Sequence, residues 1–406
     1  MRKGTFLGCF LSMLFFLGGC GGVPTATPSP PATSTPTPTP TPDPVEERLA
    51  AMTTEEKVGQ LLTVGLEGTE AGEEGEALLG ELSPGGVIFF ARNVESGEQL
   101  ATLTNDLKAY NKGKVPLFLA VDQEGGRVER LPHGEGRLPD PYEIGTKGEP
   151  SLWRDFGNTL GSQCAAMGCN VDFAPVLDIW SNPENTVIGR RAFGREAGVV
   201  SAAGTAVWKG ILEKGVLPVV KHFPGHGDTR EDSHVELPVV DRTMEELADR
   251  ELIPFREAME QGVPAVMVGH LLMTHLDAEC PATLSPLVVN GLLREELGFR
   301  GVVFTDDLTM GAVSKRWSVG EAAVLAVEAG CDQLLVCHGR ENAVAARDAL
   351  LAAVESGRLS MSRLEESVCR ILALKETLGL TDAPVPTPDM EGLAAQVGEL
   401  RAAVGR

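Results

Sequence analysis

The strongest constraint on the fold is a series of short apolar segments, each bounded by turn residues, that recurs along the chain. Eight such segments occur, at residues 62–64, 86–90, 117–121, 171–177, 217–220, 265–268, 301–304 and 333–336. Segments compatible with helices lie between most of them, including residues 97–110, 151–167, 245–261, 286–297 and 319–329. Continuous apolar strands that alternate with helices are typical of a parallel sheet covered on both faces. About eight strand–helix units in roughly 300 residues predict a single (β/α)8 TIM-type barrel.

The barrel accounts for the chain from residue 45 to residue 406, and we expect no second domain. Residues 361–379 and the stretch that follows to residue 406 are predicted to be helices that close the barrel. A Gly-x-Gly-x-x-Gly fingerprint does not follow any early strand, which weakens the dinucleotide-binding alternative. The formal net charge of −22 argues against a partner made of nucleic acid and against binding to an anionic membrane surface, because both need a basic face.

The N-terminus has the pattern of a secretory signal. Arg2 and Lys3 precede an apolar core over residues 6–17, which is shorter than a membrane-spanning helix requires. The signal peptide is predicted over residues 1–19, and its Leu-Gly-Gly-Cys ending resembles a bacterial lipoprotein box. That resemblance implies that Cys20 is lipidated and becomes the first residue of the mature chain. The alternative is an ordinary signal peptide in which Cys20 is incidental.

Residues 20–44 consist almost wholly of Gly, Pro, Thr, Ser and Ala with Pro-Thr repeats. Such a segment cannot bury a core and favours extended polyproline-type conformations, so we predict a spacer. Together with Cys20 it predicts an extracytoplasmic protein that contacts the bacterial cell membrane through a lipid anchor only.

The six cysteines of the predicted barrel do not form the dense framework of a small secreted domain. They are Cys164, Cys169, Cys280, Cys331, Cys337 and Cys369. Because most of them lie in apolar segments, we expect them to be mainly free and buried. A Cys164–Cys169 disulfide is the alternative.

Polar or ionisable residues follow nearly every predicted strand. In a barrel of this type the active site lies at the C-terminal ends of the strands. The residues found there are Arg92, Asn93, Asp122, Gln123, Glu124, Asp178, Lys221, His222, His270, Asp306, Asp307, Cys337 and His338. One such residue would usually be a helix cap or part of a solvated turn. Six or more on one rim are better explained as a substrate pocket.

The stretch from Lys221 to His234 contains three of the seven histidines of the chain. Their spacing would suit a metal ion only on a helix, and Pro224 with its flanking glycines argues against a helix. We therefore expect no metal and no cofactor, and a zinc site is the alternative. His226 has no assigned role beyond shaping the loop.

Asp232 and His234 are suited to proton transfer. In an extended loop, residues i and i+2 point the same way, so Asp232 can accept a hydrogen bond from one ring nitrogen of His234. The other nitrogen is then free to transfer a proton near neutral pH. Asp306, at the end of its strand, is the natural nucleophile, whereas Asp307 is assigned to capping or support. A carboxylate nucleophile with a separate proton donor is the arrangement of a retaining glycosidase.

Four motifs carry a specific resemblance to a known family. They are Asp122-Gln-Glu-Gly-Gly-Arg-Val-Glu-Arg130, Ile188-Gly-Arg-Arg-Ala-Phe-Gly194, Lys221-His-Phe-Pro-Gly-His-Gly227 with Asp232-Ser-His234, and Phe304-Thr-Asp-Asp-Leu-Thr-Met310. In this order they resemble the β-N-acetylglucosaminidases of glycoside hydrolase family 3, over about residues 53–378. The resemblance implies that Asp306 is the nucleophile and that His234 is the acid/base with Asp232 as its partner. It also implies a set of residues that hold N-acetylglucosamine in the −1 subsite, namely Asp122, Arg130, Arg191, Lys221 and His222.

The departures from the family pattern are small. Ala192 and Gly269 stand where Ser and Ala are common, and we expect none of the large second α/β domain that some relatives carry. An acid/base inside the barrel favours the N-acetylglucosaminidase branch, because β-glucosidases of the family generally take this group from outside the barrel. We therefore expect a monomeric retaining exo-β-N-acetylglucosaminidase that acts on peptidoglycan fragments or related β-GlcNAc glycosides.

Three alternatives remain open. The first is a β-N-acetylglucosaminide phosphorylase that uses the same site, since a neutral His repels incoming phosphate less than a Glu carboxylate. The others are a β-glucosidase or xylosidase, and a sugar-binding lipoprotein without catalytic activity.

Overall fold

The computed structural model describes Gly22 and residues 43–134, 136–230 and 236–406. The predicted signal peptide, Cys20, nearly all of the predicted linker, Asp232 and His234 lie outside the described residues. Residues Asp43–Arg406 form one compact unit. Within the described part of the chain, no helix combines the length and the apolar character that crossing a membrane requires.

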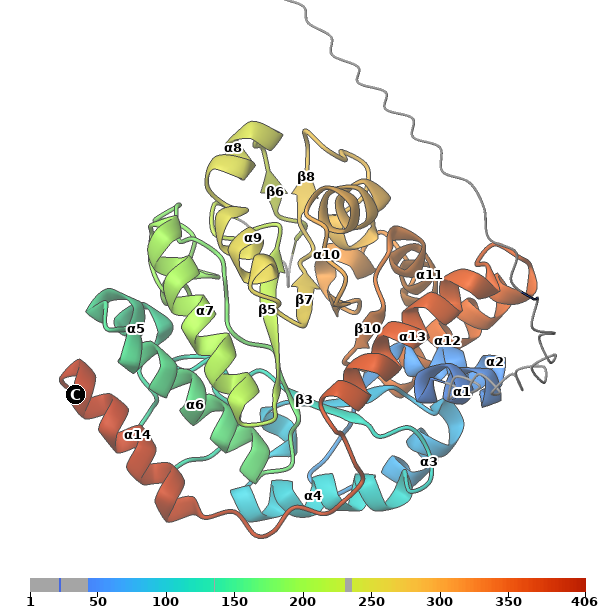
Figure 1. Cartoon of the computed structure of the whole chain (residues 1–406), viewed down its shortest axis with the longest axis horizontal. Coiled ribbons are helices and arrows are strands. Elements are labelled where there is room, and N and C mark those ends of the chain that lie inside the picture. The colour runs from blue at the N-terminus through green and yellow to red at the C-terminus, as the bar shows by residue number, and fades with distance from the viewer. Residues whose placement is uncertain (1–21, 23–42, 135, 231–235) are drawn as a thin grey trace, which may run out of the picture. The chain divides into compact units, whose positions relative to one another are not determined.

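Eight parallel strands close into a barrel in the order β1-β10-β9-β7-β5-β4-β3-β2 (Figure 1). The strands are β1 (Leu62–Gly65), β2 (Gly86–Phe89), β3 (Phe118–Val121), β4 (Val171–Asp172), β5 (Leu217–Phe223), β7 (Ala265–Val268), β9 (Val302–Asp307) and β10 (Gln333–Val336). All eight occur where the apolar segments predicted them. The predicted (β/α)8 barrel is therefore confirmed.

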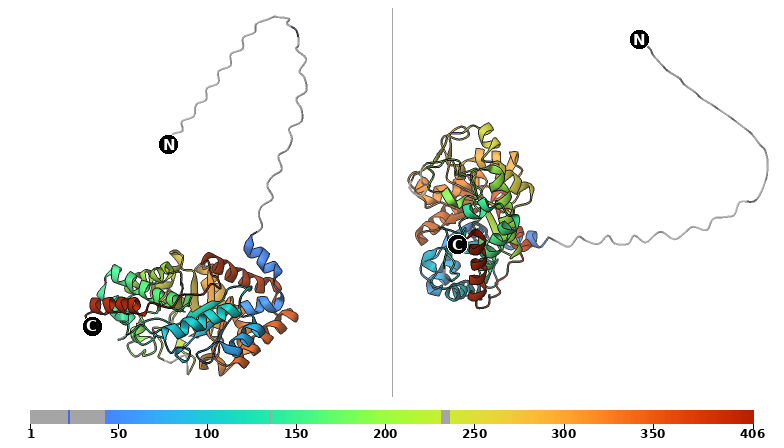
Figure 2. Two further views of the ribbon diagram at one scale, coloured as in Figure 1. Left: turned by 90° about the horizontal axis from the view of Figure 1, so that it is seen from below. Right: turned by 90° about the vertical axis from the view of Figure 1, so that its left-hand side faces the viewer.

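Helices surround the barrel, as the three views in Figures 1 and 2 show. The α-helices are α1 (Pro44–Ala51), α2 (Thr54–Gln60), α3 (Gly72–Leu82), α4 (Gly97–Tyr110), α5 (Pro141–Lys147), α6 (Pro150–Ala166), α7 (Ala197–Glu213), α8 (Met244–Asp249), α9 (Ile253–Glu260), α10 (Gly311–Ser314), α11 (Val319–Ala329), α12 (Arg340–Glu355), α13 (Met361–Thr377) and α14 (Met390–Val404). Three short 3₁₀ helices are η1 (Ala91–Asn93), η2 (Gly189–Arg191) and η3 (Ala282–Leu284), and η4 (Leu287–Glu296) is a π-helix. A capping box between Thr53 and Glu56 begins α2.

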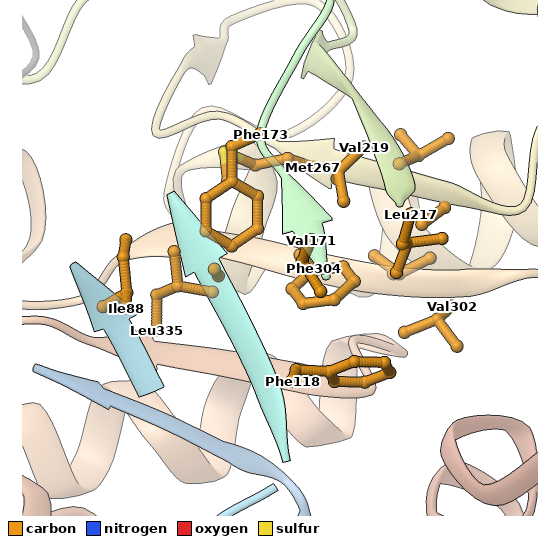
Figure 3. Packing of buried hydrophobic residues seen from close by; sticks show 14 of the residues in the cluster. Ile88, Phe118, Val171, Phe173, Leu217, Val219, Met267, Val302, Phe304 and Leu335 are labelled. Carbon is orange, nitrogen blue, oxygen red and sulfur yellow. The ribbon is translucent and has the colours of Figure 1, made fainter. Parts of the chain in front are cut away.

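The barrel interior is filled by large apolar side chains (Figure 3). The ring of Phe304 on β9 lies 6.1 Å from the ring of Phe118 and 5.5 Å from the ring of Phe173, measured between centroids. Phe173, together with Met267 and Leu335, also lines the cavity described below. The top of the hydrophobic core is therefore the floor of that cavity.

The structure corrects several predicted boundaries. The segment 171–177 contributes only two residues of strand, because Pro175 has no N–H for a continuous ladder. Its path still follows β5, since the N–H of Leu177 donates to the carbonyl of Lys221 at 2.6 Å. β5 extends to Phe223 rather than ending at residue 220, and β9 includes Asp306 and Asp307.

The predicted helix over residues 245–261 is two helices, α8 and α9, and Pro254 lies in the first turn of the second. A two-stranded parallel sheet of β6 (Val239–Val240) and β8 (Leu272–Met273) was not predicted. The six cysteines of the barrel are free, as expected, although Cys280 and Cys369 are only half-buried.

Candidate active site

A cavity of about 340 Å³ opens at the C-terminal ends of the barrel strands. It brings together all six predicted site residues that belong to the described part of the chain: Asp122, Arg130, Arg191, Lys221, His222 and Asp306. These residues come from β5, β9, the 3₁₀ helix η2 and the loop after β3. Eight of the thirteen predicted rim residues line this cavity, and the roles assigned to them stay predictions. The other five do not line it: Arg92, Asn93, Gln123, Asp178 and His270.

Glu124 joins two of the predicted sugar-binding residues. Its carboxylate accepts two hydrogen bonds of 2.7 Å from the Arg191 guanidinium and lies 2.7 Å from the Lys221 ammonium. Burial alone would raise the pKa of Glu124, but the charges of Arg191 and Lys221 outweigh burial and hold that pKa well below its usual range. The Lys221 ammonium also donates to Asp122 Oδ1 at 2.6 Å. Glu124 therefore fixes both cations at the wall of the cavity.

Replacing Glu124 by Gln is expected to reduce the free energy of unfolding by about 3 kcal/mol, because it leaves two buried cations without their shared counter-charge. Denaturant unfolding of the purified protein measures this change. A matched control is Glu365→Gln. The Glu365 carboxylate lies 2.7 Å from the Lys57 ammonium, but its side chain is 39% exposed. The control should lose less than about 1 kcal/mol. Equal losses in the two variants would contradict the structural role of Glu124.

His222 is held from both sides of its ring. Its Nδ1 lies 2.6 Å from Asp178 Oδ2, and its Nε2 lies 3.4 Å from Nη2 of Arg191. Asp178 is completely buried, and its other oxygen accepts hydrogen bonds from the backbone N–H groups of His222 and His226. Burial would raise the pKa of Asp178, but His222 and these donors lower it overall.

The predicted nucleophile, Asp306, stands on β9 and lines the cavity with its half-buried side chain. Burial would raise its pKa, but the neighbouring His270 and His222 and the backbone N–H of Asp307 lower the pKa overall. Its Oδ1 accepts a hydrogen bond of 2.8 Å from the backbone N–H of Asp307. The carboxylate is therefore kept ionised, as nucleophilic attack requires.

Asp307 supports the strand ends rather than capping α10. Its Oδ1 accepts from the backbone N–H groups of Thr309 at 3.0 Å and Cys337 at 3.1 Å, and the Thr309 hydroxyl donates to Oδ2 at 2.6 Å. The carbonyl of Asp307 lies 2.9 Å from Nε2 of the buried His270. These contacts link β9 to β10 and to the end of β7.

Arg130 is positioned through a buried amide. The Gln123 side-chain oxygen accepts hydrogen bonds from the backbone N–H groups of Arg130 at 2.8 Å and Leu131 at 3.1 Å. The Gln123 amide group in turn donates to Gln163 of α6 at 2.8 Å. The loop after β3 is thus tied to the helix layer, and Arg130 is directed to the cavity.

The loop after β5 is anchored before it reaches the undescribed residues 231–235. Asn185 donates to the carbonyl of His226 at 2.8 Å, and Asp228 pairs with Arg242 at 2.8 Å. A Cβ at Gly227 would collide with the carbonyl oxygen of Ile179, so the chain can pass there only as glycine. Asp232 and His234 follow this anchored base in the sequence but lie outside the described residues, so their roles stay predictions.

The described residues contain no group of three or more His, Cys, Asp or Glu side chains placed to hold a metal ion. The zinc alternative also involved His234, which lies outside them. Burial, followed by the neighbouring His222, lowers the pKa of His226 to about 4, so this ring is neutral at physiological pH. Its Nδ1 lies 2.8 Å from the hydroxyl oxygen of Thr229, in agreement with a role in shaping the loop.

Sequence reasoning placed Glu124 and Asp178 at strand ends but gave them no role. Their importance arises from partners far away in the chain, since Glu124 meets Arg191 and Lys221 and Asp178 meets His222. The sequence signal for both residues was a polar side chain shortly after an apolar strand. This signal does not distinguish a buried ion-pair partner from a residue exposed on the rim.

Comparisons with known proteins agree with this geometry. The family model described as glycosyl hydrolase family 3 N terminal domain matches residues 53–374. A "Beta-hexosaminidase" from Nitrosomonas eutropha is 36% identical over 324 residues, which cover 78% of this chain and 92% of the relative. Another, from Alkalilimnicola ehrlichii, is 41% identical over 287 residues, or 69% of this chain and 81% of the relative. The solved structure of a glycoside hydrolase family 3 β-N-acetylglucosaminidase from a Paenibacillus species has a TM-score of 0.83 at 45% identity, covering 86% of this chain and 68% of that one.

Proposed function

The chain belongs to glycosyl hydrolase family 3, and we propose that it is a retaining exo-β-N-acetylglucosaminidase. The relatives support the coarser activity, that of a glycoside hydrolase acting as a β-N-acetylhexosaminidase. The observation that carries the finer proposal is the cavity itself, whose lining combines the ionised carboxylate of Asp306 with the cluster of Arg191, Lys221 and Asp122.

In the proposed mechanism, Asp306 attacks the anomeric carbon of the terminal sugar and forms a covalent glycosyl-enzyme. His234 protonates the departing glycosidic oxygen, and Asp232 orients its ring. In the second step His234 removes a proton from water, the hydroxide oxygen bonds to the anomeric carbon, and Asp306 leaves as a carboxylate. Two inversions retain the β configuration.

The shape of the cavity supports removal of the terminal sugar. Its floor is closed by Phe173, Met267 and Leu335, so a glycan cannot extend through the barrel. The polar wall formed by Asp122, Arg191 and Lys221 can then grip hydroxyl and carbonyl oxygens of the sugar at the non-reducing end. A chain that enters in this way is shortened by one sugar at a time.

The proposed location follows from the N-terminal sequence alone. A signal peptide over residues 1–19, a lipidated Cys20 and the spacer after it would place the enzyme outside the cytoplasm on the cell membrane. Peptidoglycan fragments with terminal β-GlcNAc are the substrates proposed for an enzyme at that location.

The purified protein is expected to release the aryl group from aryl β-GlcNAc faster than from the matching β-glucoside or β-xyloside, because the site is proposed to bind the N-acetyl sugar. Initial rates on the three glycosides measure the preference. The product should be free GlcNAc, and added phosphate should leave the rate unchanged. A preference for the glucoside or xyloside would overturn the proposed specificity, and phosphate-dependent formation of a sugar phosphate would favour the phosphorylase. Calorimetric binding of GlcNAc without turnover would instead indicate a sugar-binding protein.

A further inference from the structure

We propose that Asp178 is a positioning residue that holds His222 in one tautomer, with the proton on Nδ1, so that the Nε2 lone pair accepts from Arg191 and holds that guanidinium in the polar wall formed by Asp122, Arg191 and Lys221. The kinetic part of this inference rests on the proposed function. The tautomer itself does not, because it follows from contacts within the protein.

The first contact that defines the tautomer is the one to Asp178. Asp178 Oδ1 already accepts from the backbone N–H of His226 at 2.7 Å and from that of His222 at 3.3 Å. Asp178 Oδ2 lies 2.6 Å from His222 Nδ1. An ionised carboxylate has no hydrogen to donate, so the hydrogen of this contact belongs to Nδ1.

The second contact is independent and leads to the same tautomer. Nη2 of Arg191 lies 3.4 Å from His222 Nε2, and a guanidinium has only N–H donors. The direction of this guanidinium is set by its two hydrogen bonds of 2.7 Å to Glu124. A hydrogen on Nε2 would face that donor, whereas a lone pair on Nε2 accepts from it. Both ends of the ring therefore require a proton on Nδ1 and a lone pair on Nε2.

The surroundings of His222 explain why an acceptor is useful there. Arg191 of η2 and Lys221 of β5 present donors to the cavity, and Arg130 adds a third. Nη2 of Arg191 carries two hydrogens, and Glu124 Oε1 accepts only one of them. The His222 ring also lies beside the neutral ring of His226, with centroids 5.8 Å apart, and Asp306 of β9 lines the same cavity. A neutral His222 with a fixed lone pair accepts the second hydrogen of Nη2, so Arg191 is held from two sides.

Asp178→Asn isolates this role. The Asn side-chain oxygen can still accept from the backbone N–H of His226, but its NH₂ group faces His222 Nδ1 and can only donate. The proton should therefore move to Nε2. Spectra of protein labelled with ¹⁵N-histidine, recorded at about pH 8 where an ordinary imidazole is neutral, distinguish the two tautomers. His222→Asn identifies the His222 signal by its loss.

The wild-type signal should show His222 protonated at Nδ1, and Asp178→Asn should show it protonated at Nε2. A wild-type His222 that carries its proton on Nε2, or that exchanges between both nitrogens, would overturn the inference. This measurement on the wild-type protein stands even if the variant does not fold.

The kinetic measurement uses a matched control. We expect Asp178→Asn to raise KM for an aryl β-GlcNAc by roughly 10- to 100-fold, with a smaller change in kcat. The reason is that the substitution removes the charge-assisted hydrogen bond that holds His222, and through it Arg191, in the polar wall. The control is Asp277→Asn, since Asp277 also accepts from one side chain, Ser285 at 2.6 Å, and from two backbone N–H groups. It lies outside the cavity and should leave KM unchanged.

An unchanged KM in Asp178→Asn, or an equal change in the control, would contradict the positioning role. The proposed function is tested separately by the loss of turnover in Asp306→Asn. If that variant retains turnover, the proposed function fails while the tautomer of His222 is still decided by the spectra.

Discussion

Replacing Asp306 by Asn is expected to reduce kcat on aryl β-GlcNAc by roughly 10⁴-fold or more, because the amide cannot form the covalent glycosyl-enzyme. The side chain is nearly isosteric, and the cavity walls formed by Glu124, Arg191 and Lys221 do not depend on it. KM, and the affinity for free GlcNAc, should therefore change far less than kcat. Steady-state kinetics and calorimetry on the same preparation measure the two quantities.

The control for this variant is Asp307→Asn on the adjacent residue. Asp307 accepts three hydrogen bonds from Thr309 and Cys337, so its loss should mainly lower thermal stability and cost much less activity. In the wild-type enzyme the reactive form of Asp306 is the carboxylate, whose pKa lies below the usual range. Activity that depends on this group should be retained down to about pH 4 and lost as the pH falls further. Full turnover in Asp306→Asn would refute the nucleophile assignment.

Replacing His234 by Ala is expected to lower kcat/KM on natural β-GlcNAc disaccharides by roughly 10²- to 10⁴-fold, the range that general acid–base catalysis supplies. A sugar leaving group needs a proton as the bond breaks, whereas a nitrophenolate leaves readily without one. The first step on activated aryl glycosides should therefore lose much less. A series of aryl glycosides with leaving groups of rising pKa measures the difference, since the variant should show a steeper dependence on that pKa than the wild type.

Asp232→Asn serves as the companion variant, because it retains the His234 ring but removes the carboxylate partner. An intermediate loss is expected, with the same dependence on the leaving group. If His234→Ala lowers the rates on all aryl glycosides by one common factor, His234 does not act as the general acid.

The residues from Lys221 to His234 divide into a part held by the barrel and a part that lies outside the described residues. Lys221 and His222 belong to β5 itself, so the barrel holds them rigidly against Glu124 and Asp178. His226 is part of the anchored base of the loop through Asn185 and Thr229. Asp232 and His234 follow this anchored segment in the sequence, and the variants described above test their predicted roles.

The sequence by itself determined the barrel and the identity of the residues on its rim. Apolar segments such as residues 265–268 and 333–336 can be buried only as central strands, and alternation with helices allows few arrangements other than a parallel barrel. Because the strands run in parallel, the residue after each strand is brought to one end, so Asp122, Lys221 and Asp306 could be placed together from local patterns.

Only the tertiary structure decided which charges pair within the cavity. Glu124 is separated from Arg191 and Lys221 by long stretches of chain, and Asp178 from His222 by more than a whole helix. Local patterns reveal that a residue is polar and near the rim. Which residues pair depends on how far each barrel strand is displaced along its neighbours, and on the shortening of β4 by Pro175. Burial then sets the strength of each pair, because the same carboxylate that is weakly held in water becomes a fixed anchor when its partners and the barrel exclude solvent.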